Sequence, residues 1–267
     1  MRPAFGMIVF GALAMAAGAH AQERSSLRDF CADRPGKGSP PCVIDVGVFQ
    51  AEMGAVDASF QRSGPGSSET YAVGALELRL GLTPNLEGQI AWTPYAQVRA
   101  RDGGATSRTS GVGDLSLTLR RSLRNPDGSG LSVALQPYVS APTGKRGIGA
   151  GGWQGGLIVP ISAPLTDEVS LGLAPQVDVV RDADGEGTHL SWSLAAGVSR
   201  SLGPMNVAFE LWGGLDDDPS GDSRQASVDL TLAWTPVDGL QFDIGVYGGL
   251  TRDTPDLEIG AGIARRF

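Results

Sequence analysis

His189 and Ser191 are the residues whose spacing comes nearest to that of a hydrolytic site. On an extended strand, residues two apart share one face, so the imidazole can accept the proton of the hydroxyl during nucleophilic attack. Leu190 and Trp192 occupy the alternate positions and are expected to face lipid, which turns the pair away from acyl chains. No Ser-Asn-Gly follows, and no Asn or Asp can be assigned to orient the base. We therefore expect no enzyme, with lipid hydrolysis as a minor alternative.

Two glycine-rich segments match nucleotide-binding motifs in spacing only. Residues 147–152 have the dinucleotide spacing, but they lead into a predicted strand, whereas that motif opens a helix. Arg146 follows Gly144-Lys145 at the position where a phosphate-binding loop needs Ser or Thr. Two cysteines and the one histidine beyond residue 21 cannot complete a structural zinc site. The sequence therefore predicts neither a cofactor nor a metal.

Charged residues at polar positions of predicted strands are the remaining functional signal. Successive side chains of a strand point to opposite faces, so the parity of a residue's position decides its face. If these strands enclose a lumen, the charges lie inward and the apolar residues outward. The inward set has eight acids and four bases: Glu77, Arg79, Glu87, Arg99, Asp114, Arg120, Asp178, Glu210, Asp229, Asp243, Glu258 and Arg266. This excess of acids predicts a weak preference for cations. The alternative is that the charges pair across a filled interior.

Strict alternation of apolar and polar residues predicts the strands that would position these charges. Leu115, Leu117 and Leu119, for example, alternate with polar residues. About twelve such segments are predicted, namely residues 43–57, 69–82, 85–99, 112–123, 131–141, 152–163, 168–180, 189–202, 205–214, 223–235, 239–249 and 256–267. Pro137, Pro160 and Pro175 lie inside three of them and each removes a ladder hydrogen bond, so the number of strands can change by two.

The connections between these segments alternate in length. Tight turns are predicted at residues 83–85, 164–167, 203–204 and 235–239, and longer polar loops at 101–110, 142–151, 181–188 and 215–222. Short turns at one end and long loops at the other are typical of outer-membrane barrels. We predict an all-β fold, a transmembrane antiparallel up-and-down β-barrel with an even number of strands, about twelve. A water-soluble β-sandwich is the alternative, since its strands also alternate.

Aromatic residues near the strand ends also favour a membrane location. Trp92, Tyr95, Trp153, Trp192, Phe209 and Trp234 can form the interfacial girdles of a barrel. The chain ends on an alternating strand that closes with Phe267, and this strand resembles the C-terminal signal by which bacterial outer-membrane barrels are recognised for insertion. The expected partners are therefore outer-membrane lipid and the barrel-assembly machinery.

The N-terminus carries an export signal. Arg2, an uncharged stretch from Phe5 to Gly18 and the small residues Ala19 and Ala21 predict a signal peptide, residues 1–21, cleaved after Ala21. Residues 22–42 are then a periplasmic segment, and residues 43–267 form the barrel. Cys31 and Cys42 flank a Pro/Gly-rich stretch and are expected to form a disulfide in an oxidising compartment.

Composition excludes a nucleic-acid-binding protein. The 267-residue chain has 21 Lys and Arg against 29 Asp and Glu, which gives a net charge of −8, and it has no basic cluster. Evenly spread apolar residues, 41% of the chain, also distinguish it from a disordered protein. A folded, exported and acidic protein is expected.

Several short motifs, taken in order, resemble one known family. They are Cys31-Ala32-Asp33-Arg34-Pro35-Gly36-Lys37 with Pro41-Cys42, then Gln50-Ala51-Glu52, Ser110-Gly111-Val112-Gly113-Asp114-Leu115, Ala141-Pro142-Thr143-Gly144 and Gly152-Trp153. Together with the closing strand, they resemble the outer-membrane transporter family associated with the meta-cleavage pathway of phenol degradation. The resemblance implies a barrel that passes small solutes passively, with aromatic or hydrophobic compounds as candidate substrates. A non-conducting structural or adhesive barrel is the alternative.

Overall fold

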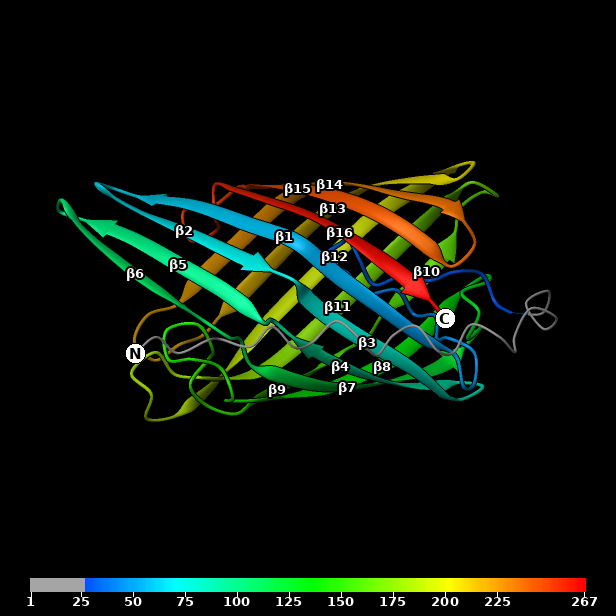
Figure 1. Ribbon diagram of the computed structural model, residues 1–267, viewed down its shortest axis with the longest axis horizontal. Coiled ribbons are helices and arrows are strands. Elements are labelled where there is room, and N and C mark those ends of the chain that lie inside the picture. Colours follow the sequence, from blue (N-terminus) through cyan, green and yellow to red (C-terminus); the bar gives the residue numbers. More distant parts are fainter. Residues whose placement is uncertain (1–26) are drawn as a thin grey trace, which may run out of the picture.

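The alternating segments form one antiparallel sheet that closes on itself in the computed structural model, which describes residues 27–267 (Figure 1). The strands are β1 (Phe49–Ser63), β2 (Gly66–Val73), β3 (Ala75–Thr83), β4 (Leu86–Trp92), β5 (Tyr95–Asp102), β6 (Ala105–Gly111), β7 (Leu115–Arg124), β8 (Ser132–Ala141), β9 (Gln154–Ile158), β10 (Ile161–Pro164), β11 (Val169–Arg181), β12 (Thr188–Leu202), β13 (Met205–Asp216), β14 (Ser223–Val237), β15 (Leu240–Gly249) and β16 (Leu257–Arg266). First and last strands pair from Gln50↔Arg266 to Phe60↔Leu257, which closes the barrel.

Twelve strands cross the barrel, and the predicted fold is confirmed. Four strands of the barrel are each divided into two segments, β2/β3, β4/β5, β6/β7 and β9/β10, so sixteen segments make twelve strands. Pro160 separates β9 from β10 because it has no N–H to donate to the ladder, although its carbonyl accepts from the N–H of Ala134. Pro137 and Pro175 lie within β8 and β11 without ending them.

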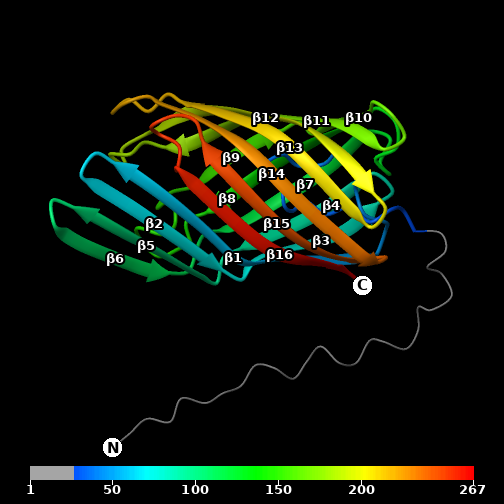
Figure 2. The same cartoon turned by 90° about the horizontal axis from the view of Figure 1, so that it is seen from above.

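One predicted loop is a hairpin instead. Residues 101–110 continue as the end of β5 and as β6, joined by a two-residue turn at Gly103 and Gly104, both with positive φ. Glycine adopts that backbone conformation without steric cost, so the pair makes a tight hairpin turn. The C-terminal half of β1 forms an extension beyond one end of the barrel, together with β2, β5 and β6 (Figure 2).

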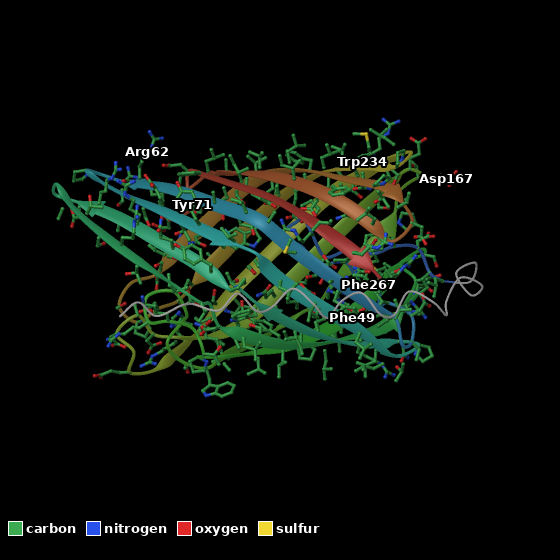
Figure 3. All side chains as sticks on the ribbon, viewed as in Figure 1. Phe49, Arg62, Tyr71, Asp167, Trp234 and Phe267 are labelled. Atoms are coloured by element: carbon green, nitrogen blue, oxygen red, sulfur yellow. A yellow bond between two sulfur atoms is a disulfide. The ribbon has the colours of Figure 1, made fainter. Side chains whose placement is uncertain are left out.

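The two faces of the wall have opposite polarity. On β14, Leu230 on the outer face is 57% exposed, while its neighbour Asp229 on the inner face is fully buried. Large apolar side chains are exposed in the same way on the outer faces of the other strands, and Figure 3 shows them projecting around the barrel. A soluble sandwich would instead bury its apolar faces between two sheets. Within residues 27–267, no helix is long and apolar enough to cross a membrane.

The ends of the barrel differ as predicted. The turns at residues 84–85, 165–168, 203–204 and 238–239 lie at the end that also holds Phe267, and we call it the short-turn end. Residues 142–153, 182–187, 217–222 and 250–256 form loops at the opposite, long-loop end. Phe267 and Phe49 meet at the short-turn end, with ring centroids 5.8 Å apart (Figure 3).

We expect Phe267 to be needed for efficient assembly. Its N–H donates to the carbonyl of Phe49 at 2.8 Å, and its ring packs on that of Phe49, so it completes the seam between the first and last strands. Deleting Phe267 should reduce the folded fraction severalfold, measured as the heat-modifiable band of outer-membrane fractions on gels. Phe242→Ala is the matched control because this outward ring lies away from the seam. Equal loss in both variants would contradict a specific role for the terminal residue.

Candidate functional site

The segment between the two cysteines, predicted as part of a periplasmic segment separate from the barrel, lies inside the barrel. Residues 31–42, which we call the plug, contact the inner wall through charged side chains, and Figure 1 shows this dark-blue coil within the barrel. The predicted disulfide joins Cys31 and Cys42. The sequence did not predict this location of the plug, because composition alone does not reveal that the charges of the plug match those of the lumen. The predicted signal peptide lies outside the described residues.

Five charged side chains fix the base of the plug, and we call them the arginine network: Asp33, Glu52, Arg79, Glu87 and Arg120. Arg79 bonds to Glu52 at 2.9 Å, to Glu87 at 2.8 Å and to Asp33 at 3.1 Å. Arg120 bonds to Glu87 at 3.2 Å and also to Asp33. Both guanidinium groups are fully buried, so the plug carboxylate bridges two buried cations of the wall. Buried charges persist only when they are paired in this way.

Arg34 attaches the plug to the adjoining part of the wall, on β1 and β15. Its Nε donates to Asp243 at 3.2 Å and its Nη2 to Asp57 at 3.3 Å. The side-chain amide of Gln241 donates to the Arg34 carbonyl, and the Tyr247 hydroxyl donates to the carbonyl of Pro35. The base of the plug is therefore held along one continuous part of the wall, from β7 through β1 to β15.

The tip of the plug rests on Glu210 of β13. This carboxylate accepts the backbone N–H of Lys37 at 2.9 Å and that of Gly38 at 3.1 Å. A Cβ at Gly38 would lie 2.9 Å from Glu210 Oε2 and 3.2 Å from the Ala195 Cβ. A larger residue at position 38 would therefore displace the Glu210 carboxylate that holds the tip of the plug.

Two of the cavities beside the plug are large. One, of about 730 Å³, runs between the plug and the wall from β10 to β15. Its wall residues are mainly small: Ser162, Gly172, Ala174, Ala195, Ser199, Ala208, Thr231 and Ala233. The second, of about 500 Å³, lies toward the long-loop end and is bounded by Lys37, Trp212 and Glu258. The lumen is thus partly filled by the plug and partly open.

Most of the charges predicted to face inward lie on the inner face. Arg79, Glu87, Arg120, Asp178, Asp229 and Asp243 are buried there, Glu210 and Glu258 contact the plug, Glu77 borders a further cavity against it, and Arg266 bonds to the Arg28 carbonyl. Asp114 instead holds the β8–β9 loop by accepting the N–H groups of Gly144 and Ala150, each at 2.7 Å. Arg79, Glu87 and Arg120 are paired, so the interior is filled on the side of the arginine network. The cavity of about 730 Å³ lies on the other side.

Arg99 does not face the lumen, and that prediction was wrong. Asp57, Ala72 and Ala96 are successive cross-strand partners on the inner face, which places Arg99, three residues beyond Ala96, on the outer face. There it lies 3.6 Å from Glu69. The irregular residues 93–94 between β4 and β5 shift the alternation of inward and outward side chains by one position. Counting every second residue from the inward Glu87 therefore assigns the wrong face to residues of β5.

His189 and Ser191 do not form a nucleophile and base pair. His189 Nδ1 lies 2.8 Å from Asp182, its Nε2 lies 2.7 Å from Asp216, and the Ser191 hydroxyl donates to the Leu215 carbonyl at 3.3 Å. Asp218, in the neighbouring loop, lies 3.7 Å from Nδ1. The hydrogen bond from the Ser220 hydroxyl lowers the pKa of Asp218 below its usual value, so this loop is anionic at neutral pH. The histidine links the β11–β12 and β13–β14 loops.

Several site residues escaped the sequence prediction. The plug charges Asp33, Arg34 and Lys37 were assigned to a segment outside the barrel, although three charges within a short disulfide loop were a usable signal. Trp212 has the same parity as Glu210 and faces the lumen, where Lys37 Nζ lies 4.8 Å from its ring centroid. Parity could have identified this tryptophan, whereas aromatic residues were assigned only to the girdles.

Comparison with known proteins places the chain in a family. Residues 32–267 match the family described as "Putative MetA-pathway of phenol degradation", and the chain belongs to it. The search of curated proteins found no match.

Two solved structures resemble the fold. An outer membrane channel from Pseudomonas putida F1 has a TM-score of 0.72 at 18% identity, over 87% of this chain and 99% of that one. The β domain of the Bordetella autotransporter BrkA has a TM-score of 0.54 at 12% identity, over 84% and 100%. At these identities the likeness establishes the outer-membrane barrel fold.

We expect Asp33→Asn to loosen the plug. The amide keeps the shape of the side chain but loses the charge that bridges Arg79 and Arg120, and hydrogen bonds to charged groups each contribute about 1.5–3 kcal/mol. Trypsin cleavage after Lys37 in the folded protein should accelerate at least tenfold. Fragments are analysed after reduction because the disulfide holds them together. Asp256→Asn, which removes an exposed pair with Arg62, is the control and should leave the rate unchanged. Equal rates in both variants would contradict the anchoring role.

Proposed function

We propose that this member of the phenol-degradation family is an outer-membrane channel for the passive passage of small solutes, restricted by its own N-terminal plug. The short-turn end is then periplasmic and the long loops are extracellular, as in other outer-membrane barrels. Export through a cleaved signal peptide and insertion by the barrel-assembly machinery, which reads the strand ending in Phe267, complete the proposal.

The observation that carries this proposal is the cavity between the plug and the wall from β10 to β15. A barrel whose only task is structural is expected to fill its interior with side chains, as the arginine network does on the other side. Here the wall bears Ala, Ser, Gly and Thr over several consecutive strands, and about 730 Å³ stays open. Small side chains leave space that a modest displacement of the plug would join to the second cavity.

The charges of the lumen favour cations. Glu210, Asp229 and Glu258 lie on the inner face near a single cation, Lys37. In a narrow passage with low-dielectric walls, an excess of one charge attracts the opposite ion and is weakly screened. A small aromatic solute is the candidate substrate suggested by the description of the family, since the aromatic faces of Trp212 and Tyr247 border this region.

A non-conducting barrel whose loops bind a partner is the alternative. The longest loop between strands at the long-loop end, residues 142–153, is tied down by Asp114 and by the Lys145 ammonium, which donates to the Ser110 carbonyl. Loops bound to the barrel in this way offer little extended surface for adhesion. Conductance measurements separate the two functions.

We expect Ser199→Phe to reduce conduction. Ser199 lines the cavity from β12, so a phenyl ring there narrows the passage. Conductance in planar bilayers and solute entry into liposomes should fall severalfold. Val198→Phe is the matched control, because its neighbouring side chain lies on the outer face, 41% exposed, where a larger ring meets lipid. If both variants conduct as the wild type does, the cavity is not the path, and if the wild type passes neither ions nor solutes, the structural alternative replaces the channel.

Selectivity tests the contribution of the inward carboxylates. Replacing Asp229 and Asp243 together by Asn removes two charges from the inner face and should lower the ratio of potassium to chloride permeability, measured from reversal potentials. Glu168→Gln is the control, because this carboxylate pairs with Arg200 on the exposed short-turn end. An unchanged ratio in the double variant would show that permeating ions do not pass these carboxylates.

A further inference from the structure

The ammonium group of Lys37 occupies a cage on the inner wall. Its Nζ donates to Glu258 at 2.8 Å and to the Ser227 hydroxyl at 3.0 Å. It also lies 4.8 Å from the ring centroid of Trp212 and 5.2 Å from that of Tyr247. Aromatic faces and a carboxylate around one cation are the features that proteins use to recognise organic ammonium ligands.

The wall of this cage has more negative charge than Lys37 can neutralise. Glu210, Asp229, Tyr247 and Glu258 are successive cross-strand partners on β13, β14, β15 and β16, so they form one row across the inner face. Glu210 is occupied by the backbone N–H groups of the plug. Asp229 is fully buried, and neither of its carboxylate oxygens has a hydrogen-bond partner among the described residues. Of the three carboxylates in this row, Glu258 bonds to the Lys37 ammonium, and Asp229 is left without a partner among the described residues.

The cage is accessible from the long-loop end. The cavity of about 500 Å³ is bounded by Lys37, Trp212 and Glu258 and extends to Asp216 at the end of β13. A solute that enters between the loops reaches the Lys37 ammonium before it reaches the rest of the plug.

Lys37 can leave the cage without dismantling the plug. Its side chain is a flexible stem that ends in a point charge, and the arginine network and Arg34 hold the plug through other residues. The ammonium is thus a tethered occupant of a site that a free cation can also fill.

We propose that Trp212, Ser227, Asp229, Tyr247 and Glu258 form a binding site for the ammonium group of a small organic cation, which Lys37 occupies in the closed channel. The inference rests on the proposed channel function and specifies its substrate class: alkyl or arylalkyl ammonium compounds. Entry of such a solute displaces Lys37 and frees the tip of the plug, so the permeant itself promotes opening.

Binding is measured on the full-length protein in detergent by isothermal titration calorimetry, with benzylammonium as the probe and benzyl alcohol as its neutral counterpart. In the wild type the probe competes with a tethered ammonium whose effective concentration is about millimolar. Lys37→Met removes this competitor and should tighten benzylammonium binding at least tenfold, while benzyl alcohol binds weakly to both proteins. Lys37→Gln, which keeps a polar side chain, is a second variant in case the first does not assemble.

Charge variants made in the Lys37→Met background locate the site. Asp229→Asn and Glu258→Gln should each weaken benzylammonium binding at least tenfold. Asp114→Asn is the matched control, since this carboxylate precedes β7 on the other side of the barrel, accepts the N–H groups of Gly144 and Ala150, and does not line this cavity. It should change the affinity less than twofold.

Three results would overturn the proposal: equal affinity for the amine and the alcohol, no tightening in either Lys37 variant, or equal losses in the Asp114 and Asp229 variants. Because binding is measured in detergent, it is independent of conduction. If benzylammonium binds as described but the reconstituted protein passes no current, the channel function fails and the cation site stands. If current flows and no binding is found, only the cation site fails.

Discussion

The pairing of two fully buried guanidinium groups is the constraint on which the closed state depends. Arg79 and Arg120 lie inside a barrel, out of contact with water, and an unpaired buried charge costs several kcal/mol. The wall alone supplies Glu52 and Glu87, and the plug supplies Asp33 between the two arginines. Glu52 and Glu87 already balance the two arginines in charge, so Asp33 holds the plug by completing the bonds of both guanidinium groups. The disulfide limits the shapes that this short segment can take.

Strand periodicity determines much of this architecture, and it fails at identifiable places. Alternation predicted all twelve strands because one face must be apolar toward lipid and the other polar toward the lumen. It failed at Arg99 because residues 93–94 shift the register, and at residues 101–110 because a polar hairpin beyond the lipid belt needs no apolar face. The plug was missed for a different reason: its position depends on long-range charge pairing, which has no period in the sequence.

The site was predictable only in part for the same physical reason. Parity placed Asp229, Asp243 and Glu258 on the inner face, but it does not reveal which charges have partners. Asp243 pairs with Arg34 and Glu258 with Lys37, whereas Asp229 has no hydrogen-bond partner in the described part of the chain. These differences arise from a segment about 190 to 220 residues away in sequence, so no local pattern carries them.

The two sides of the plug are held by different kinds of interaction, and this asymmetry indicates where opening begins. On the side of β3, β4 and β7, fully buried guanidinium groups make several fixed bonds, and their rupture would leave charges unpaired in a dry environment. On the side of β10 to β14, the contacts are two backbone N–H groups on Glu210 and the flexible Lys37 ammonium on Ser227, next to an existing cavity with small side chains. The Arg34–Asp243 pair on β15 limits this side. Separation there costs fewer buried ion pairs and widens space that is already open. Opening should therefore proceed by movement of the plug tip away from β13, with the arginine network as the fixed point.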